Sequence, residues 1–128
     1  MDYVKSFREL IVYKLSRQLA KEIFECSKTF PREEMYSLTD QIRRASRSIG
    51  AQIAEAWGNR RYERHFVSKL TDADGEQLET QHWIETALDC RYIAPEKAAD
   101  LIQKCAVIGK MLSSMMDKAP SFCRKISN

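Results

Sequence analysis

One stretch of the chain, residues 38–57, constrains the fold more than any other. As a helix turning about 100° per residue, it places six apolar side chains on one narrow stripe: Leu38, Ile42, Ala45, Ile49, Ile53 and Ala56. The side away from this stripe combines arginines with very small residues: Arg43, Arg47, Gly50, Ala51 and Ala54. Small residues allow another backbone to approach closely, so this helix has two packing faces. Such a helix is typical of a subunit in an oligomer.

Three further segments have the same helical periodicity. The first runs from about Leu10 to Thr29 and ends at Phe30-Pro31, because the residue before a proline avoids the α region. The third runs from about Tyr62 to Tyr92, with Phe66, Leu70, Ala73, Ile84 and Leu88 facing the core. The fourth begins at Ala94-Pro95, because proline is favoured at the first helical position. Its apolar stripe contains Leu101, Ile102, Cys105, Ile108, Leu112 and Met115.

Two short signals mark the ends of the second helix. Ser37-Leu38-Thr39-Asp40 is similar to a capping box and predicts its start. Gly58-Asn59 supplies residues that tolerate the left-handed region and predicts its end. Four amphipathic helices with short connections predict an all-α, antiparallel up-down-up-down four-helix bundle over residues 1–119. Residues 120–128 begin at Pro120 and are expected to form a frayed tail.

The third predicted helix carries polar side chains on its apolar face. Gln77, Thr80 and Gln81 fall on that face. Buried amides need hydrogen-bond partners. We therefore expect a polar layer in which these side chains bond to other helices, with Glu55 or Arg44 as partners.

The same helix contains Glu79-Thr80-Gln81-His82, a Glu-x-x-His unit of the kind that di-iron bundles use twice. A second copy on another helix is missing, because the other histidine, His65, lies on the same helix. His82 also points about 150° away from the apolar stripe, so a surface histidine is the better interpretation. The sequence has no Ser-His-Asp, Cys-His or glycine-rich phosphate signature. We expect no enzyme activity, metal, cofactor or small-molecule substrate.

Charge is unevenly distributed along the chain, whose formal net charge is +3. Residues 40–70 carry +4, residues 71–100 carry −6 and residues 101–128 carry +4. The basic block can be neutralised by the acidic block within or between subunits. No apolar run approaches the roughly 20 residues of a membrane span, and no export signal is present. We expect a cytoplasmic protein without a membrane partner, whose four cysteines are reduced structural thiols.

The arginines around the second helix are the candidate functional residues. Arg60, Arg61 and Arg64 flank the predicted turn, from which side chains can reach phosphates, and Arg44 is a further candidate for contact with RNA or DNA. The aromatic residues Trp57 and Tyr62 are close enough in sequence to stack on bases.

The alternative is that these arginines form a solvated surface or structural ion pairs. Three acids, Asp72, Glu76 and Glu79, share one side of the third helix with Trp83. These three residues are named the acidic stripe. We expect Arg43 and Arg47 to pair with the acidic stripe of a neighbouring subunit.

Several motifs closely resemble one protein family. It is the family of four-helix-bundle proteins encoded in intervening sequences of bacterial large-subunit ribosomal RNA genes, often labelled ribosomal-protein-like. The resemblance covers about residues 7–116 and rests on Phe7-x-x-Leu10, Phe30-Pro31-x-x-Glu34-x-Tyr36-x-Leu38-Thr39-x-Gln41-x-Arg43-Arg44-Ala45, Ser48-Ile49-x-x-x-Ile53-Ala54-Glu55 and Phe66-x-x-x-Leu70-x-x-Ala73-x-Gly75-x-x-x-Glu79.

This resemblance implies a homo-oligomeric ring, typically a pentamer, of antiparallel bundles. It also implies kinship with the accessory protein of diversity-generating retroelements, a ring-forming partner of a reverse transcriptase that contacts nucleic acid through a basic surface. No enzymatic activity is implied. The sequence therefore predicts a homo-oligomeric scaffold that contacts RNA, DNA or a nucleoprotein through arginines. The alternative is a protein-binding adaptor whose charges serve only self-assembly.

Overall fold

The computed structural model describes residues 4–123, and all regular structure in that range is helical. The four long helices are α1 (Ile11–Ser27), α2 (Asp40–Gly58), α3 (Glu63–Asp89) and α4 (Pro95–Asp117). Shorter elements are η1 (Phe7–Glu9), η2 (Arg32–Glu34), η3 (Met35–Thr39) and α5 (Ala119–Phe122). The all-α fold class predicted from the sequence is confirmed.

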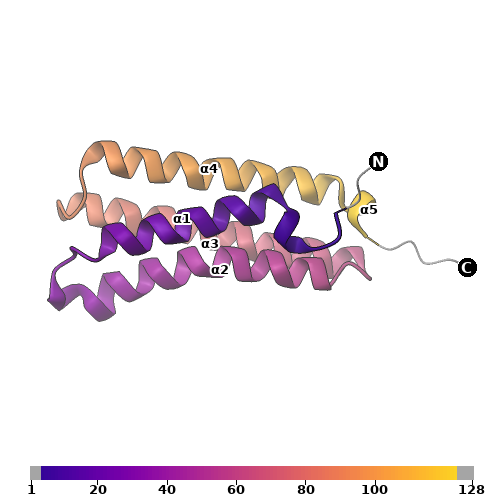
Figure 1. The fold of residues 1–128 in the computed structure, drawn as a ribbon, viewed down its shortest axis with the longest axis horizontal. Helices are drawn as coiled ribbons and strands as arrows, with labels where there is room; N and C mark the ends of the chain where they lie inside the picture. The colour runs from indigo at the N-terminus through magenta and orange to yellow at the C-terminus, as the bar shows by residue number, and fades with distance from the viewer. Residues whose placement is uncertain (1–3, 124–128) are drawn as a thin grey trace, which may run out of the picture.

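The four long helices extend along the long axis of the molecule (Figure 1). The connections from α1 to α2 and from α3 to α4 lie at one end, and the connection from α2 to α3 lies at the other. Helix α2 packs against α1 and α3, and α4 packs against the same two helices. The two sides of α2 therefore meet different neighbours.

The predicted apolar stripes form the core. All six apolar residues of the stripe in residues 38–57 are buried, and Leu38, the first of them, belongs to η3. The core residues predicted in α3 and α4 are also buried, except Leu88 and Ile102, which are half-buried. Burying each large aliphatic side chain contributes about 1.5–3 kcal/mol. This periodic burial stabilises the four long helices as one packed unit.

The start of α2 differs from the predicted capping box. The chain is already helical before Asp40, because η2 leads directly into η3, a single π-helical turn. The Ser37 hydroxyl donates to Glu34 Oε1 over 2.7 Å, and Thr39, at the N-cap position, makes no capping bond. Thr39 Oγ1 is buried without a hydrogen-bond partner among residues 4–123. The capping-box prediction is wrong, because the preceding helical turns already supply carbonyl acceptors.

The end of α2 also differs from the prediction. Asn59 has φ −104° and ψ 20°, so it is not left-handed. Its amide Nδ2 instead donates to the Glu55 carbonyl over 2.7 Å. The positive φ in the described residues is that of Arg91, at 63°, just after α3. A side-chain hydrogen bond therefore replaces the predicted left-handed ending at Gly58-Asn59.

The polar residues of α3 are buried as expected, but their partners are not on other helices. Gln77 is 4% exposed, Thr80 is fully buried and Gln81 is half-buried. Gln81 Nε2 donates to Gln77 Oε1 over 2.8 Å, and Gln77 Nε2 donates to Asp74 Oδ1 over 2.9 Å. Thr80 Oγ1 donates to the Glu76 carbonyl over 2.8 Å. The predicted bonds to other helices are wrong, because residues three and four apart on one helix already satisfy these groups.

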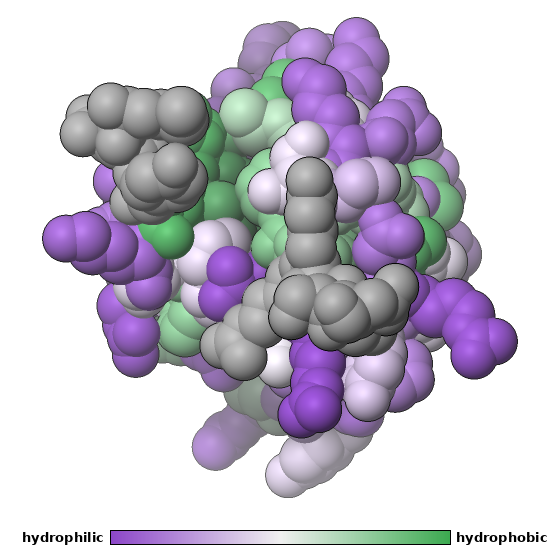
Figure 2. All heavy atoms as spheres, turned by 90° about the vertical axis from the view of Figure 1, so that its right-hand side faces the viewer, coloured by the Kyte–Doolittle hydropathy of each residue, from purple (hydrophilic) through white to green (hydrophobic). Residues whose placement is uncertain are grey.

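The C-terminal end of the described chain packs onto the bundle. The Phe122 ring of α5 stacks on the buried Phe66 ring, with 5.7 Å between centroids. The helical, packed structure therefore continues past residue 119, and residues 124–128 of the expected frayed tail lie outside the described range. Seen from this end, hydrophilic side chains project around the periphery and hydrophobic surface gathers nearer the centre (Figure 2). None of the helices within residues 4–123 combines the length and the hydropathy that a membrane-spanning segment needs.

Candidate assembly and nucleic-acid surfaces

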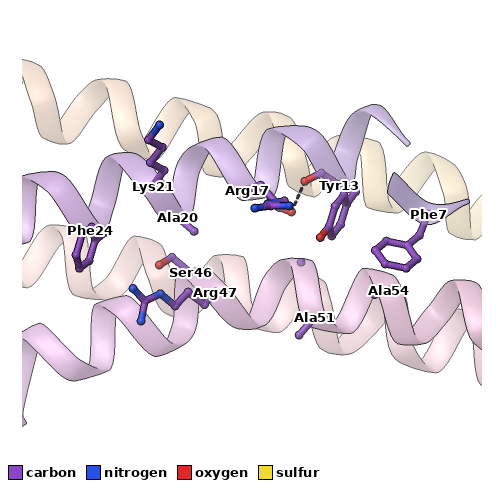
Figure 3. Close-up of a pocket in the computed structure, with 12 residues that line it drawn as sticks. Phe7, Tyr13, Arg17, Ala20, Lys21, Phe24, Ser46, Arg47, Ala51 and Ala54 are labelled. Carbon is purple, nitrogen blue, oxygen red and sulfur yellow. Dashed lines mark hydrogen bonds between the residues drawn. The ribbon is translucent and has the colours of Figure 1, made fainter. Parts of the chain in front are cut away.

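A groove of about 530 Å³ runs between α1 and α2 (Figure 3). Its twelve lining residues, which define the α1–α2 groove, are Phe7, Tyr13, Ser16, Arg17, Ala20, Lys21, Phe24, Ser46, Arg47, Gly50, Ala51 and Ala54. Figure 3 shows Phe7 and Phe24 at the two ends of the groove, with Tyr13 pointing from α1 towards α2. The groove therefore has aromatic walls and a floor of small residues.

Four of the predicted interface residues line this groove from the α2 side. Ala51 is exposed and Ala54 half-buried, so both are accessible to another molecule. Gly50 is buried against α1 of the same chain, where an added Cβ would lie 3.1 Å from Ser16 Oγ. Its small size therefore serves packing within the chain, whereas the sequence pattern had suggested contact with another subunit.

The two arginines expected to meet a neighbour both lie over Phe24 of α1. The Arg43 guanidinium is 4.8 Å from the centroid of this ring, and that of Arg47 is 5.4 Å away. Arg43 is half-buried and also donates from Nε to Ser27 Oγ over 2.8 Å. Arg43 is therefore bound within its own chain, whereas Arg47 is exposed and its charge meets no carboxylate among the described residues.

Positive charge on the groove is uncompensated. None of the twelve lining residues is acidic. Its three cations, Arg17, Lys21 and Arg47, form no ion pair within residues 4–123. The edge between α1 and α4 is different, because Glu22 Oε1 there lies 2.7 Å from Lys104 Nζ. The lack of ion pairs is thus a feature of the groove and not of every surface of α1.

The acidic stripe also lacks ion pairs within residues 4–123. Asp72 and Glu79 are exposed, Glu76 is half-buried, and none of the three forms an ion pair within the described part of the chain. The Trp83 indole donates to Glu79 Oε2 over 3.1 Å. Partial burial and then the nearby Glu79 carboxylate raise the pKa of Glu76, and the Arg44 guanidinium only partly offsets this. One turn before Asp72, Lys69 Nζ lies 3.9 Å from Glu55 Oε1 of α2, so the stripe lies at the edge of α3 that faces α2.

The arginines at the turn between α2 and α3 have two different environments. The Arg60 guanidinium stacks 3.5 Å from the Trp57 ring centroid and donates from Nε to the Trp57 carbonyl over 2.7 Å. This arrangement covers one face of the indole that was expected to stack on bases. Arg61 and Arg64 are exposed and form no ion pair within residues 4–123. Between them Tyr62 is 47% exposed.

Two further residues named from the sequence are Arg44 and His82. Arg44 is exposed and forms no ion pair among the described residues, although its charge acts on Glu76. His82 is exposed, as predicted, and its ring packs against Trp83 with 4.7 Å between centroids. In residues 4–123, no group of three or more His, Cys, Asp or Glu side chains is placed to hold a metal ion.

Sequence reasoning missed the α1 half of the groove. Arg17, Lys21 and Phe24 recur at helical spacing but lie beside the apolar stripe of α1, which contains Leu19 and Ile23. Two cations and an aromatic ring on one flank of a helix were the available signal. Their meaning depends on α2 lying next to them, which periodicity alone does not show.

Comparison with known proteins identifies the family. The sequence profile of the 23S rRNA-intervening sequence proteins matches residues 8–114. The chain belongs to this family. It is also similar to a crystal structure of a protein of unknown function from the S23 ribosomal protein family of Bacteroides thetaiotaomicron VPI-5482, with 30% identity and a TM-score of 0.75. The match covers 84% of this chain and 96% of the other. No similar sequence was found among curated proteins.

The family assignment confirms the resemblance given by the second-helix motif, and it agrees with a helical, ribosomal-protein-like chain. The related crystal structure has no assigned function, so it adds support for the fold and not for an activity.

Proposed function

We propose that this protein is a non-enzymatic, cytoplasmic scaffold that self-assembles into a ring and contacts RNA or DNA through exposed arginines. The expected ring has five copies, because this is the assembly that the family resemblance implies. Each subunit is taken to be an antiparallel up-down-up-down four-helix bundle. The alternating positions of the helix connections in Figure 1 support that topology.

One observation carries the nucleic-acid part of the proposal. Arg61 and Arg64 are both exposed without a carboxylate partner among the described residues, and Tyr62 between them is about half exposed. Arginine side chains at such a turn can reach phosphate oxygens, and an exposed aromatic ring can stack on a base. Arg60 is assigned to holding the turn, because it is engaged with Trp57.

Self-assembly would multiply this contact. The turn between α2 and α3 lies at one end of the bundle (Figure 1). In a ring, this end of every subunit would present one copy of Arg61 and Arg64. Several weak contacts on one nucleic-acid strand then act together, because binding at one subunit raises the effective concentration at the next. A scaffold of this kind needs no cleft for chemistry.

Salt-titrated binding tests the proposal. Wild-type protein and Arg61→Gln/Arg64→Gln are measured by fluorescence anisotropy with labelled single-stranded RNA and DNA. Each arginine that no longer neutralises a phosphate should reduce the slope of log affinity against log salt by about 0.7 on a single strand. The matched control is Arg32→Gln/Arg91→Gln, which removes two exposed arginines at the opposite end of the bundle.

The result has two informative outcomes. Weaker binding and a shallower slope for the turn variant alone support the proposal. Equal affinity and slope for all three proteins would remove the turn from nucleic-acid binding. Light scattering on the wild type gives the assembly state independently, and a monomer at micromolar concentration would exclude the ring.

A second function is favoured by the uncompensated charges beside α2. If neither RNA nor DNA binds with a salt-dependent affinity, the chain is better described as a protein-binding adaptor whose charges serve only self-assembly. The acidic stripe and the cations of the α1–α2 groove are the surfaces that such an adaptor would use.

A further inference from the structure

We infer that copies of this chain associate head to tail, with the α1–α2 groove of one copy receiving the acidic stripe and Trp83 of the next. This inference rests on the proposed self-assembly and specifies the two surfaces that make it. The partner is a second copy of this chain, chosen because its charge and spacing fit the groove.

The groove and the acidic stripe carry opposite charges. The groove has three cations without carboxylate partners and no acidic lining residue, in the part of the chain that the structure describes. The three carboxylates of the acidic stripe form no ion pair in the same range, although Arg44 acts electrostatically on Glu76. Complementary potentials orient two proteins and suppress wrong pairings. Each surface therefore supplies the charge that the other lacks.

The charged residues of the acidic stripe and of the groove have matching spacings along their helices. On α3, Asp72, Glu76 and Trp83 span eleven residues, which is about 16 Å at 1.5 Å per residue. Arg17 and Lys21 are four residues apart, as are Asp72 and Glu76. An antiparallel arrangement of the two helices therefore places Asp72 opposite Lys21 and Glu76 opposite Arg17. Trp83, seven residues beyond Glu76, then lies opposite the end of the groove that Phe7 and Tyr13 line.

Shape is the third argument. Ala51 and Ala54 leave the α2 side of the groove low, and Gly50 and Ser46 form a buried floor. Such a surface accepts a helix carrying one large ring, and Trp83 supplies that ring at the end of the stripe. Aromatic residues seated in pockets dominate the affinity of many protein interfaces.

The same molecule cannot join the two surfaces itself. The groove lies between α2 and α1, whereas the acidic stripe lies at the edge between α3 and α2. One turn before Asp72, Lys69 Nζ of α3 is 3.9 Å from Glu55 Oε1 of α2. Each copy therefore has one unfilled groove and one unfilled stripe. A contact between unlike surfaces is heterologous, so it generates rings or open helical assemblies and leaves two free surfaces in a dimer.

Charge reversal on either surface tests the inference. The groove variant is Arg17→Glu/Arg47→Glu, and the stripe variant is Asp72→Lys/Glu76→Lys. Each variant alone should be a monomer by light scattering, because its two surfaces then carry the same sign. Mixing the two variants restores opposite charges at every contact, so they should assemble again. Reassembly on mixing also shows that both variants are folded.

The composition of the mixture gives a second readout. In a head-to-tail assembly the two variants must alternate, so native mass spectrometry should find assemblies in which the numbers of the two variants are equal or differ by one. A closed five-membered ring is then impossible. The matched control, Lys14→Glu/Lys110→Glu, has the same charge change at exposed lysines outside the groove and should assemble like the wild type.

Failure of this inference is distinguishable from failure of the proposed function. A groove variant that assembles like the wild type, or two variants that stay monomeric on mixing, would overturn the head-to-tail contact while leaving self-assembly intact. A mixture that forms dimers and nothing larger would point to a two-fold contact and would also overturn the head-to-tail contact. A groove variant that assembles but no longer binds RNA would reassign the groove to nucleic acid. A monomeric wild type would remove the proposed assembly itself.

Discussion

The glycine in the middle of α4 offers a quantitative test of the packing. Gly109 lies against the buried amide of Gln77, and a Cβ added there would be 2.7 Å from Gln77 Nε2. The amide cannot move freely, because it donates to Asp74 Oδ1 and accepts from Gln81 Nε2. Gly75, in the middle of α3, has no neighbouring atom within 4 Å of an added Cβ. Gly75 is therefore a matched control for the same substitution.

Two effects of opposite sign decide the outcome. Alanine in place of glycine inside a helix stabilises it by about 1 kcal/mol, so Gly75→Ala should be more stable than the wild type by about that amount. Gly109→Ala gains the same helix propensity but displaces the Gln77 amide. Leaving a buried amide unpaired costs about 1–3 kcal/mol. We therefore expect Gly109→Ala to be less stable than Gly75→Ala by about 1–3 kcal/mol.

Urea unfolding followed by circular dichroism measures both variants at one protomer concentration, because association also changes apparent stability. A double-mutant cycle isolates the contact. A Gln77→Ala variant has no amide to displace. In that background, adding Gly109→Ala should raise the free energy of unfolding by about 1 kcal/mol. The reasoning is refuted if Gly109→Ala stabilises as much as Gly75→Ala and the cycle is additive within about 0.5 kcal/mol.

Two further predictions concern cysteine and tyrosine groups. Burial raises the pKa of the Cys105 thiol to about 12, so a thiol reagent at about pH 8 should label exposed Cys90 rapidly and Cys105 only after unfolding, as mass spectrometry of the labelled peptides would show. The Tyr92 hydroxyl donates to Glu34 Oε2 over 2.7 Å, which raises the pKa of Tyr92 from 10.0 to about 12. This hydrogen bond should stabilise the folded chain fully below pH 10, and the stabilisation should be lost as the pH rises towards 12. In urea titrations, Tyr92→Phe should therefore lack this fall in the free energy of unfolding. An unchanged fall in Tyr92→Phe would contradict the assignment.

Helix positions and the core were predictable from the sequence because burial repeats with the helix itself. The apolar residues of α2 alternate at three and four positions, and no other regular structure would bury them together. Proline at position 95 fixed the start of α4 for an equally local reason, its preset φ and missing donor. These properties do not depend on which helices become neighbours.

The helix ends and the polar contacts were harder, because several partners compete for the same groups. Thr39 has a side chain suited to capping, but the preceding π-helical turn removes the need for it. Asn59 can adopt the left-handed region, yet its amide bonds to the backbone instead. Gln77 was placed correctly in the interior, while its bonding partner was decided by distances along its own helix.

In the candidate site, too, some residues could be predicted from the sequence and others could not. The α2 half of the groove follows from Arg47, Ala51 and Ala54 lying opposite a clear apolar stripe. Arg60 and Arg61 are adjacent and chemically identical, but one folds back onto Trp57 and the other projects from the turn. The Arg61 guanidinium lies 5.7 Å from the centroid of the Tyr62 ring, whereas Arg60 also bonds to the Trp57 carbonyl. No sequence pattern distinguishes such neighbours, because backbone geometry at the turn decides which partner each side chain meets.

The proposed contact between subunits and the proposed contact with nucleic acid depend on different physical forces. At physiological salt, charges on exposed surfaces are screened over about 8 Å, so exposed ion pairs contribute only about 0–1 kcal/mol each. The contact between the α1–α2 groove and the acidic stripe must therefore take most of its affinity from Trp83 and the aromatic walls, with charge setting register. Nucleic-acid contact through Arg61 and Arg64 has no comparable apolar area and depends on counterion release. Rising salt should consequently release nucleic acid while the assembled scaffold persists.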